Sequence, residues 1–265
     1  MLVYMLKSNC QRESGGLFKE IFYGWWIVGI AGFMLTLMSL SVFQGLGTML
    51  VGLERHFGWS RTAMSGAFAL ARIEGALLGP IEGFLIDRFG CKRLIFIGYT
   101  IMGIGFLIFS MVGSLWHFYI AFCVVTLGGG LGGWLANISL INNWFDRRRG
   151  FAMALALLGV HLGGFLVPIL AFGIDTHGFR WTTLGIGVFL LLIIGPVIKF
   201  VRNRPEDFGM RPDGGTLITQ QPESIEVTNA QDIEPEFTPI QALKTPVFYI
   251  LTVAHVSSSV SIMTL

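Results

Sequence analysis

Long apolar stretches separated by short polar segments dominate the sequence. Seven of them contain 20 residues or more, the length that an α-helix needs to cross a hydrocarbon core of about 30 Å. In lipid a helix satisfies its own backbone hydrogen bonds, and the alternating pattern of a membrane β-barrel is absent from the sequence. The pattern therefore predicts an all-α integral membrane protein. The predicted spans cover residues 25–50, 62–86, 94–115, 118–141, 151–174, 181–200 and 246–265.

The polar segments divide the chain into four parts. Residues 1–24 form an N-terminal segment, and residues 25–201 hold six of the predicted spans. Residues 202–245 are rich in Pro, Glu, Gln and Thr, a composition typical of a solvated linker. Residues 246–265 form a seventh span with no polar tail behind it. We therefore expect a six-helix bundle followed by the start of a second bundle, in a chain that is truncated.

Composition and charge narrow the class of protein. Hydrophobic residues make up 53% of the chain and charged residues 13%, so the lipid bilayer is its main solvent. The net charge is only +2, and no basic cluster is interleaved with aromatic residues outside the turns that flank the predicted spans, which argues against nucleic-acid binding. The three cysteines, Cys10, Cys91 and Cys123, have neither disulfide nor zinc-ligand spacing.

The distribution of Lys and Arg predicts the orientation in the membrane. With the N-terminus in the cytoplasm, fourteen of the 18 basic residues fall on the cytoplasmic side. Only Arg55, Arg61 and Arg180 fall on the other side, and Arg72 lies inside a predicted span. Basic residues concentrate on the cytoplasmic side of membrane proteins. We expect a multi-pass protein of a bacterial-type cytoplasmic membrane, with its N-terminus in the cytoplasm.

A charged turn joins the second and third predicted spans. Residues 83–93 have the sequence GFLIDRFGCKR. This turn resembles the signature G-x-L-x-D-R-x-G-R-K-x of the major facilitator superfamily, with Cys91 in place of a basic residue. The resemblance implies twelve helices in two six-helix halves that rock around a central site, and this chain would hold the first half. The C-terminal half that completes the transporter is then a partner of the predicted bundle.

Two further segments resemble one branch of that superfamily. WFDRRRG at residues 144–150 precedes the fifth span, and RNRPEDFGMRPDG follows the sixth. Both are similar to the monocarboxylate and oxalate/formate transporters. This resemblance implies a small organic anion, such as a mono- or dicarboxylate, moved by proton symport or by exchange for a counter-anion. It also implies that important substrate-binding cations lie in helices beyond this sequence.

The charged turn is also a candidate gate on physical grounds. Gly83 allows a neighbouring helix to approach closely, and Asp87 can accept hydrogen bonds from a facing helix or pair with an arginine. By resemblance, Asp87 and Arg88 hold a cytoplasmic gate in the outward-open state. The alternative is a simple positive-inside anchor, for which Asp and Gly would be needless. The predicted gate comprises Gly83, Asp87, Arg88, Gly90, Lys92 and Arg93, with Glu82 in its network.

Polar residues inside the predicted spans are candidates for the substrate path. Arg72 and Glu74 lie near the middle of the second span but point about 200° apart on a helix. Arg72, on a stripe with Gly75 and Gly79, is a candidate site for an anionic substrate; the alternative is a structural ion pair. Glu74 is a candidate protonation site, because desolvation disfavours its charged form; the alternative is an interhelical hydrogen bond.

Three weaker candidates lie in other spans. His161 is central in the fifth span, where an imidazole could relay protons or bind substrate, or could simply bond a neighbouring helix. Gln44 and Asn137 are candidates for contacts that line a cavity. Residues 128–133, GGGLGG, match a nucleotide-binding pattern by letters, but inside an apolar span they predict helix packing.

Other functional classes remain in view. No catalytic triad, metal-ligand cluster or phosphate-binding loop is apparent, so we expect neither an enzyme nor a cofactor. Within transport, the alternative is a proton-coupled exporter of metabolites or drugs. An alternative outside transport is a half-length membrane module that binds a partner.

Overall fold

The computed structural model describes residues 22–206, 210, 212–214 and 245. The chain divides into two units, residues 1–217 and 218–265, and nearly all the described residues belong to the first. These described residues form helices without a strand, which confirms the all-α prediction. The predicted span at 246–265 lies outside them. The elements are α2 (Tyr23–Met38), the π-helical η1 (Ser39–Phe43), α3 (Gly45–Phe57), α4 (Arg61–Phe89), α5 (Cys91–Ser110), α6 (Leu115–Gly132), α7 (Trp134–Trp144), α8 (Arg149–His177), α9 (Phe179–Phe200) and the 3-10 turn η3 (Pro212–Gly214).

Five helical segments in the described part of the chain are long and apolar enough to cross a membrane. Each of them overlaps one of the predicted spans. The remaining span, predicted at 62–86, is α4, which has 29 residues but carries Arg72, Glu74 and Glu82 along its length. Its length suffices for a crossing, and its polar side chains set it apart from the other five. The five segments are Tyr23–Phe57, Cys91–Ser110, Leu115–Trp144, Arg149–His177 and Phe179–Phe200.

Two predicted spans differ from the helices that the structure shows. The first, predicted to end at residue 50, continues to Phe57, where Gly58 adopts a left-handed conformation with φ of +68°. It also contains the π-helical turn η1, which inserts an extra residue between α2 and α3. The span predicted at 118–141 is two helices, because the backbone breaks at Gly133 between α6 and α7. Hydrophobicity alone reveals neither irregularity.

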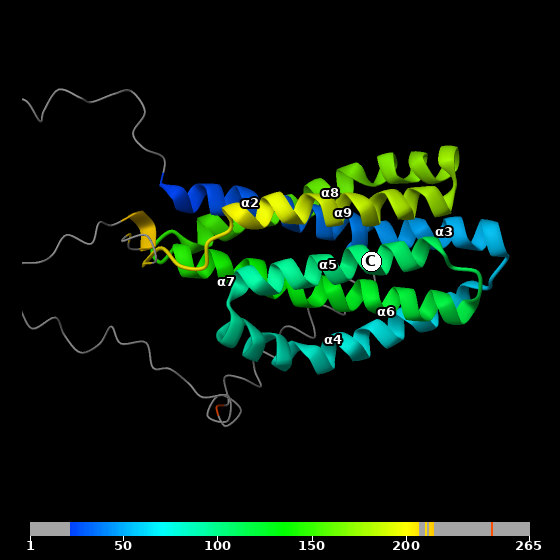
Figure 1. The fold of residues 1–265 in the computed structure, drawn as a ribbon, viewed down its shortest axis with the longest axis horizontal. Coiled ribbons are helices and arrows are strands. Elements are labelled where there is room, and N and C mark those ends of the chain that lie inside the picture. Colours follow the sequence, from blue (N-terminus) through cyan, green and yellow to red (C-terminus); the bar gives the residue numbers. More distant parts are fainter. Residues whose placement is uncertain (1–21, 207–209, 211, 215–244, 246–265) are drawn as a thin grey trace, which may run out of the picture. The chain divides into compact units, whose positions relative to one another are not determined.

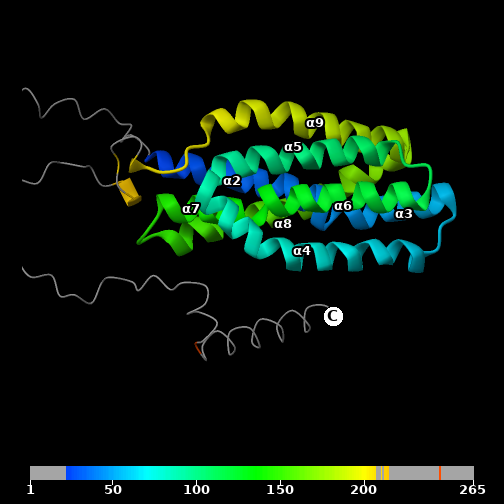
Figure 2. The same ribbon diagram turned by 60° about the horizontal axis from the view of Figure 1, so that its bottom comes forward.

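The helices of the first unit run back and forth along one direction (Figure 1). The α3–α4, α5–α6 and α8–α9 connections lie at one end, and the α4–α5 and α7–α8 connections lie at the other. Figure 2 shows the same separation of the two ends after rotation. Arg55, Arg61 and Arg180, the basic residues predicted to lie outside the cytoplasm, belong to or flank the first set of connections. This alternation is the one expected from six successive spans.

Glycine residues bring α5 and α6 into close contact. A Cβ atom added to Gly98 would collide with the backbone of Gly132, and one added to Gly128 would collide with the backbone of Met102. Small residues permit this approach of two backbones in membrane proteins, where packing rather than water exclusion holds helices together. The prediction that the GGGLGG segment serves helix packing is therefore confirmed. A similar contact joins α2 and α8, where a Cβ on Gly159 would meet the carbonyl of Gly32.

Candidate functional site

The predicted gate turn is a tight junction between α4 and α5. Gly90 ends α4 and begins α5 with φ of +78°, a conformation that disfavours residues with a side chain. A Cβ at this position would lie 2.7 Å from the side-chain nitrogen of Asn203. Gly90 is therefore required both by backbone conformation and by the space that Asn203 occupies.

Asn203, which follows α9, holds this turn in place. Its Oδ1 accepts a hydrogen bond from the backbone N–H of Lys92 at 2.8 Å. Its own carbonyl accepts one from Asn143 Nδ2 at 3.2 Å. One residue earlier, the carbonyl of Arg202 accepts a hydrogen bond from Trp144 Nε1 at 2.9 Å. The segment after α9 thus joins the α4–α5 turn to the end of α7.

Asp213 makes a second connection from the same segment, to the start of α8. Its carboxylate accepts hydrogen bonds from the backbone N–H groups of Asp146, Arg147 and Arg148, at 3.2, 2.6 and 3.4 Å. A carboxylate at a helix N-terminus satisfies unpaired N–H groups and complements the helix dipole. We call Asn203 and Asp213 the linker brace. The sequence analysis gave neither residue a role. The segment RNRPEDFGMRPDG that contains both was noted for its resemblance to one branch of the superfamily, but that resemblance did not predict their contacts.

The charged side chains of the predicted gate are open to solvent. Asp87, Arg88 and Arg93 are exposed, and the guanidinium of Arg88 lies 5.7 Å from the ring centroid of Phe89. Within the described residues, Asp87 has no hydrogen bond or ion pair. The expected close helix approach at Gly83 is also not made there, because no described atom lies within 4 Å of a Cβ built on Gly83. The close helix approach at Gly83 therefore stays a prediction.

Glu82 faces away from the gate charges. Its side chain is 8% exposed, and an oxygen lies 2.7 Å from the position of a Cβ on Gly130 of α6. Asp87 is exposed at the end of the same helix, and the two carboxylates share no described partner. The structure therefore places Glu82 in the α4–α6 interface. No described contact joins Glu82 to the gate residues, so its role in the gate network stays a prediction.

Arg72 and Glu74 occupy different environments on α4, in agreement with the predicted angle between them. Arg72 is exposed, and its stripe continues through Gly75 and Gly79, where a Cβ would meet no described atom within 4 Å. This stripe is open rather than closely packed. Glu74 is half-buried against α6, where its Oε2 lies within hydrogen-bonding distance of Thr126 Oγ1, at 2.9 Å.

Gln44, between η1 and α3, and His161, on α8, are exposed. Gln44 follows the π-helical turn, donates from Nε2 to Ser39 Oγ at 3.2 Å, and lies beside Gly164 of α8. Ser39 in turn donates to the carbonyl of Val160 at 2.7 Å. Isolated π-helical turns occur frequently at functional sites, which keeps Gln44 a candidate. His161 is accessible and has no hydrogen-bond partner among the described residues.

Asn137 does not line a cavity, so that prediction was wrong. Its side chain is fully buried, and Nδ2 donates to the carbonyls of Gly132 and Gly133 at 3.1 and 2.5 Å. These carbonyls lie where α6 and α7 break, and an interrupted helix leaves backbone groups that need new partners. Asn137 therefore stabilises the break.

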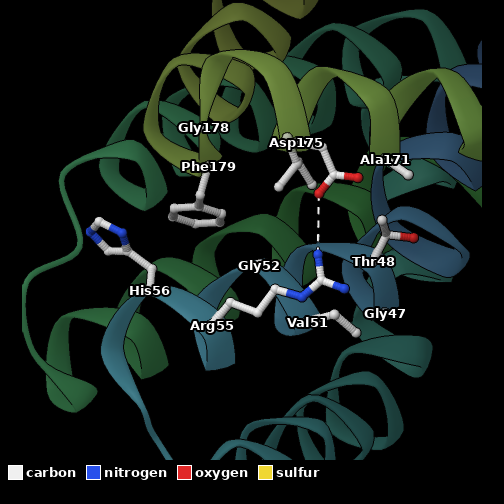
Figure 3. Close-up of a pocket in the computed structure, with 11 residues that line it drawn as sticks. Gly47, Thr48, Val51, Gly52, Arg55, His56, Ala171, Asp175, Gly178 and Phe179 are labelled. Atoms are coloured by element: carbon white, nitrogen blue, oxygen red, sulfur yellow. Dashed lines mark hydrogen bonds and ion pairs between the residues drawn. The ribbon is translucent and has the colours of Figure 1, made fainter.

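A pocket of about 510 Å³ opens between α3 and α8 at the opposite end from the linker brace (Figure 3). Arg55 and Asp175 form an ion pair across it, with 3.2 Å between Nη1 and Oδ1. Both side chains are more than half exposed, so water screens the pair, and it holds the two helix ends together only weakly. None of the predicted site residues lines this pocket. The described residues also contain no group of three or more His, Cys, Asp or Glu side chains that could hold a metal ion.

Helices α2–α9, the signature turn and the polar residues on α4 can be compared with known families. The sequence model of the Major Facilitator Superfamily matches residues 26–265. The chain belongs to the major facilitator superfamily. This finding confirms the resemblance inferred from residues 83–93 and the multi-pass membrane architecture. It also identifies α2–α9 as helices of a major facilitator bundle.

Curated relatives point to one branch of the superfamily. Monocarboxylate transporter 11 of Mus musculus is 30% identical over 172 residues, which cover 63% of this chain and 38% of the relative. Monocarboxylate transporter 6 of the same species is 29% identical over 170 residues, covering 63% and 36%. The MFS-type transporter pynF of Aspergillus niger is 27% identical over 195 residues, covering 71% and 44%. The matched regions thus span less than half the length of these relatives.

Proposed function

We propose that this superfamily member moves a small organic anion, such as a mono- or dicarboxylate, across a membrane by alternating access. Transport is driven by proton symport or by exchange for a counter-anion. The similarity to proteins named monocarboxylate transporters supports the substrate class. The single structural observation that supports it most is the exposed guanidinium of Arg72, halfway along α4.

An arginine in the middle of a membrane helix is costly unless it faces water or an opposite charge. Arg72 has no ion pair among the described residues, and no described atom lies within 4 Å of a Cβ built on Gly75 or Gly79. We infer that this stripe faces the central path between the two halves. There the guanidinium would bind a substrate carboxylate through two parallel N–H donors. Gln44 and His161, both exposed, are proposed to contribute weaker polar contacts to the same path.

The second half of the path is supplied by helices beyond the described residues. In our proposal, the two bundles rock against each other, and the turn around Asp87 and Arg88 closes the cytoplasmic side. Exposure of both charges is consistent with partners in that second bundle. The linker brace keeps the first bundle rigid at this end, so that the bundle moves as one body.

We further propose that the N-terminus and the end that carries the linker brace are cytoplasmic. This end holds Arg147 and Arg148 of the α7–α8 connection and Arg202 and Arg204 after α9, which agrees with the positive-inside rule. The bacterial-type cytoplasmic membrane remains a prediction, and the relatives described above come from a mammal and a fungus.

Uptake by reconstituted protein tests the proposed function. Proteoliposomes that contain the protein in its full length are offered radiolabelled lactate, pyruvate, oxalate and succinate. Saturable uptake that rises with an imposed inward proton gradient indicates symport, and uptake that requires internal substrate indicates exchange. Uptake of none of these anions under either condition would contradict the proposed substrate class. Energy-dependent efflux of apolar amines instead would favour an exporter.

A further inference from the structure

The contact between Glu74 and Thr126 contains more hydrogen-bond acceptors than protons. Thr126 Oγ1 lies 2.9 Å from Glu74 Oε2, 3.0 Å from the carbonyl oxygen of Phe122 and 3.1 Å from that of Cys123. A threonine hydroxyl has one proton to donate and two lone pairs with which to accept. If its proton goes to the helix carbonyl of Phe122, the contact with Glu74 requires a proton on the carboxyl group.

The second carboxyl oxygen of Glu74 is isolated. Oε1 is buried and has no hydrogen-bond partner among the described residues. Glu74 takes part in none of the described ion pairs Arg55–Asp175, Arg61–Glu54 and Arg149–Asp146. The described residues therefore offer an ionised Glu74 carboxylate one hydrogen bond at most.

Few other charged or titratable groups face Glu74. Arg72, on the same helix, points about 200° away and is exposed. On α6, the thiol of Cys123 interacts electrostatically with Glu74. Burial of an unpaired charge costs far more than burial of a neutral polar group with a hydrogen bond. If Glu74 is protonated, its O–H can donate to Thr126 Oγ1 while the Thr126 hydroxyl donates to the carbonyl of Phe122. Each of the two protons then has an acceptor, and no unpaired charge is buried.

We propose that Glu74 carries the coupled proton, with Thr126 as its positioning residue. The inference rests on the proposed function, because a coupled proton has a role only in a transporter. In each cycle the Glu74 carboxylate takes one proton from water on one side and forms an O–H bond. It then releases that proton to water on the other side, so that one proton crosses with each monovalent anion.

Glu82 provides a matched comparison within the same interface. It lies eight residues further along α4, about 12 Å at 1.5 Å per residue, and is also buried against α6. Its described neighbour is Gly130, which offers no hydroxyl. A carboxyl infrared band that arises from the Glu74–Thr126 contact should therefore change in Thr126 variants and remain in the Glu82→Gln variant.

Infrared spectroscopy of the lipid-reconstituted, full-length protein tests the proton on Glu74 without any transport assay. The difference between wild type and Glu74→Gln at pH 7 should contain the C=O stretching band of a protonated carboxyl. That band should shift in Thr126→Val, keep its position in Thr126→Ser, and remain in Glu82→Gln. The proposal would be overturned by a difference spectrum that contains only bands of ionised carboxylate. It would also be overturned if the C=O band of the protonated carboxyl has the same position in wild type, Thr126→Val and Thr126→Ser.

Transport separates this inference from the proposed function. Glu74→Gln should lose about tenfold or more of the accumulation that a proton gradient drives, while exchange of preloaded carboxylate continues. Proton-driven accumulation at the wild-type level in Glu74→Gln would contradict a coupling role. If Glu74→Gln does not fold, a shift of the pH profile of uptake in Thr126→Val, absent in Thr126→Ser, supports the proposal, and identical profiles oppose it. If the wild type moves no carboxylate, the proposed function fails and the infrared result still decides the protonation of Glu74.

Discussion

Asn203 Oδ1 accepts a hydrogen bond from the backbone N–H of Lys92 at 2.8 Å, across 111 residues of sequence. We expect Asn203→Ala to lower the free energy of unfolding by about 1–2 kcal/mol, because the N–H of Lys92 loses its partner. Thermal unfolding in detergent measures the change. Arg204→Ala, at an exposed position nearby, is the control and should have little effect. Equal melting temperatures for Asn203→Ala and wild type would show that the contact does not stabilise the turn.

Asp213 binds the start of α8 through three backbone N–H groups. Asp213→Asn keeps an acceptor and tolerates the positive φ of 62°, but it removes the charge that complements the helix dipole. We expect a loss of about 0.5–1 kcal/mol that shrinks at high salt, measured by thermal unfolding at two ionic strengths.

Asp146→Asn is the matched control for Asp213. Asp146 carries the same charge at the same end of α8, but its side chain is exposed and forms only a 3.6 Å pair with Arg149. Such exposed pairs contribute about 0–1 kcal/mol. If Asp146→Asn destabilises the protein more than Asp213→Asn does, our interpretation of the linker brace is wrong.

Gly98 tests the close packing of α5 on α6. A Cβ at this position collides with the backbone of Gly132, which cannot rotate away as a flexible side chain would. We expect Gly98→Ala to destabilise the bundle by about 1–3 kcal/mol and to lower the yield of folded protein. Size-exclusion chromatography with thermal unfolding measures both. Gly29→Ala, where no described atom lies within 4 Å of a Cβ, should be tolerated; similar behaviour of the two variants would argue against the packing.

Cysteine labelling tests the proposed orientation. In a background with Cys10, Cys91 and Cys123 replaced by serine, single cysteines are introduced as Arg61→Cys and Arg148→Cys, both at exposed positions. A membrane-impermeant maleimide applied to intact cells should label the first variant. It should label the second only after permeabilisation. The reverse pattern would place the N-terminus outside the cytoplasm.

The positions of the spans were predictable because lipid imposes one dominant requirement, an apolar helix of sufficient length. The gate turn was recognisable because its residues are contiguous in sequence. In contrast, the π-helical turn before Gln44 and the break at Gly133 change the backbone without changing the hydrophobic pattern. Asn137 was misassigned for that reason, since its role depends on the break.

The linker brace could not be predicted because its contacts join distant parts of the chain. Asp213 meets the start of α8 across 65 to 67 residues. No periodic pattern encodes such a contact. The contrast between Arg72 and Glu74 was predictable from helix geometry alone, but the partner of Glu74, Thr126, required the packing of α4 on α6.

Uptake by Arg72 variants tests the proposed substrate path most directly. Wild type, Arg72→Lys and Arg72→Gln are reconstituted, checked for equal folding by thermal unfolding, and compared for saturable uptake of radiolabelled carboxylates. We predict that Arg72→Gln loses about 100-fold or more in kcat/KM. Arg72→Lys should retain part of the wild-type kcat/KM because it keeps the positive charge, and should lose the rest because it lacks the two parallel donors. Wild-type uptake in a folded Arg72→Gln variant would contradict a role for Arg72 in binding the anion.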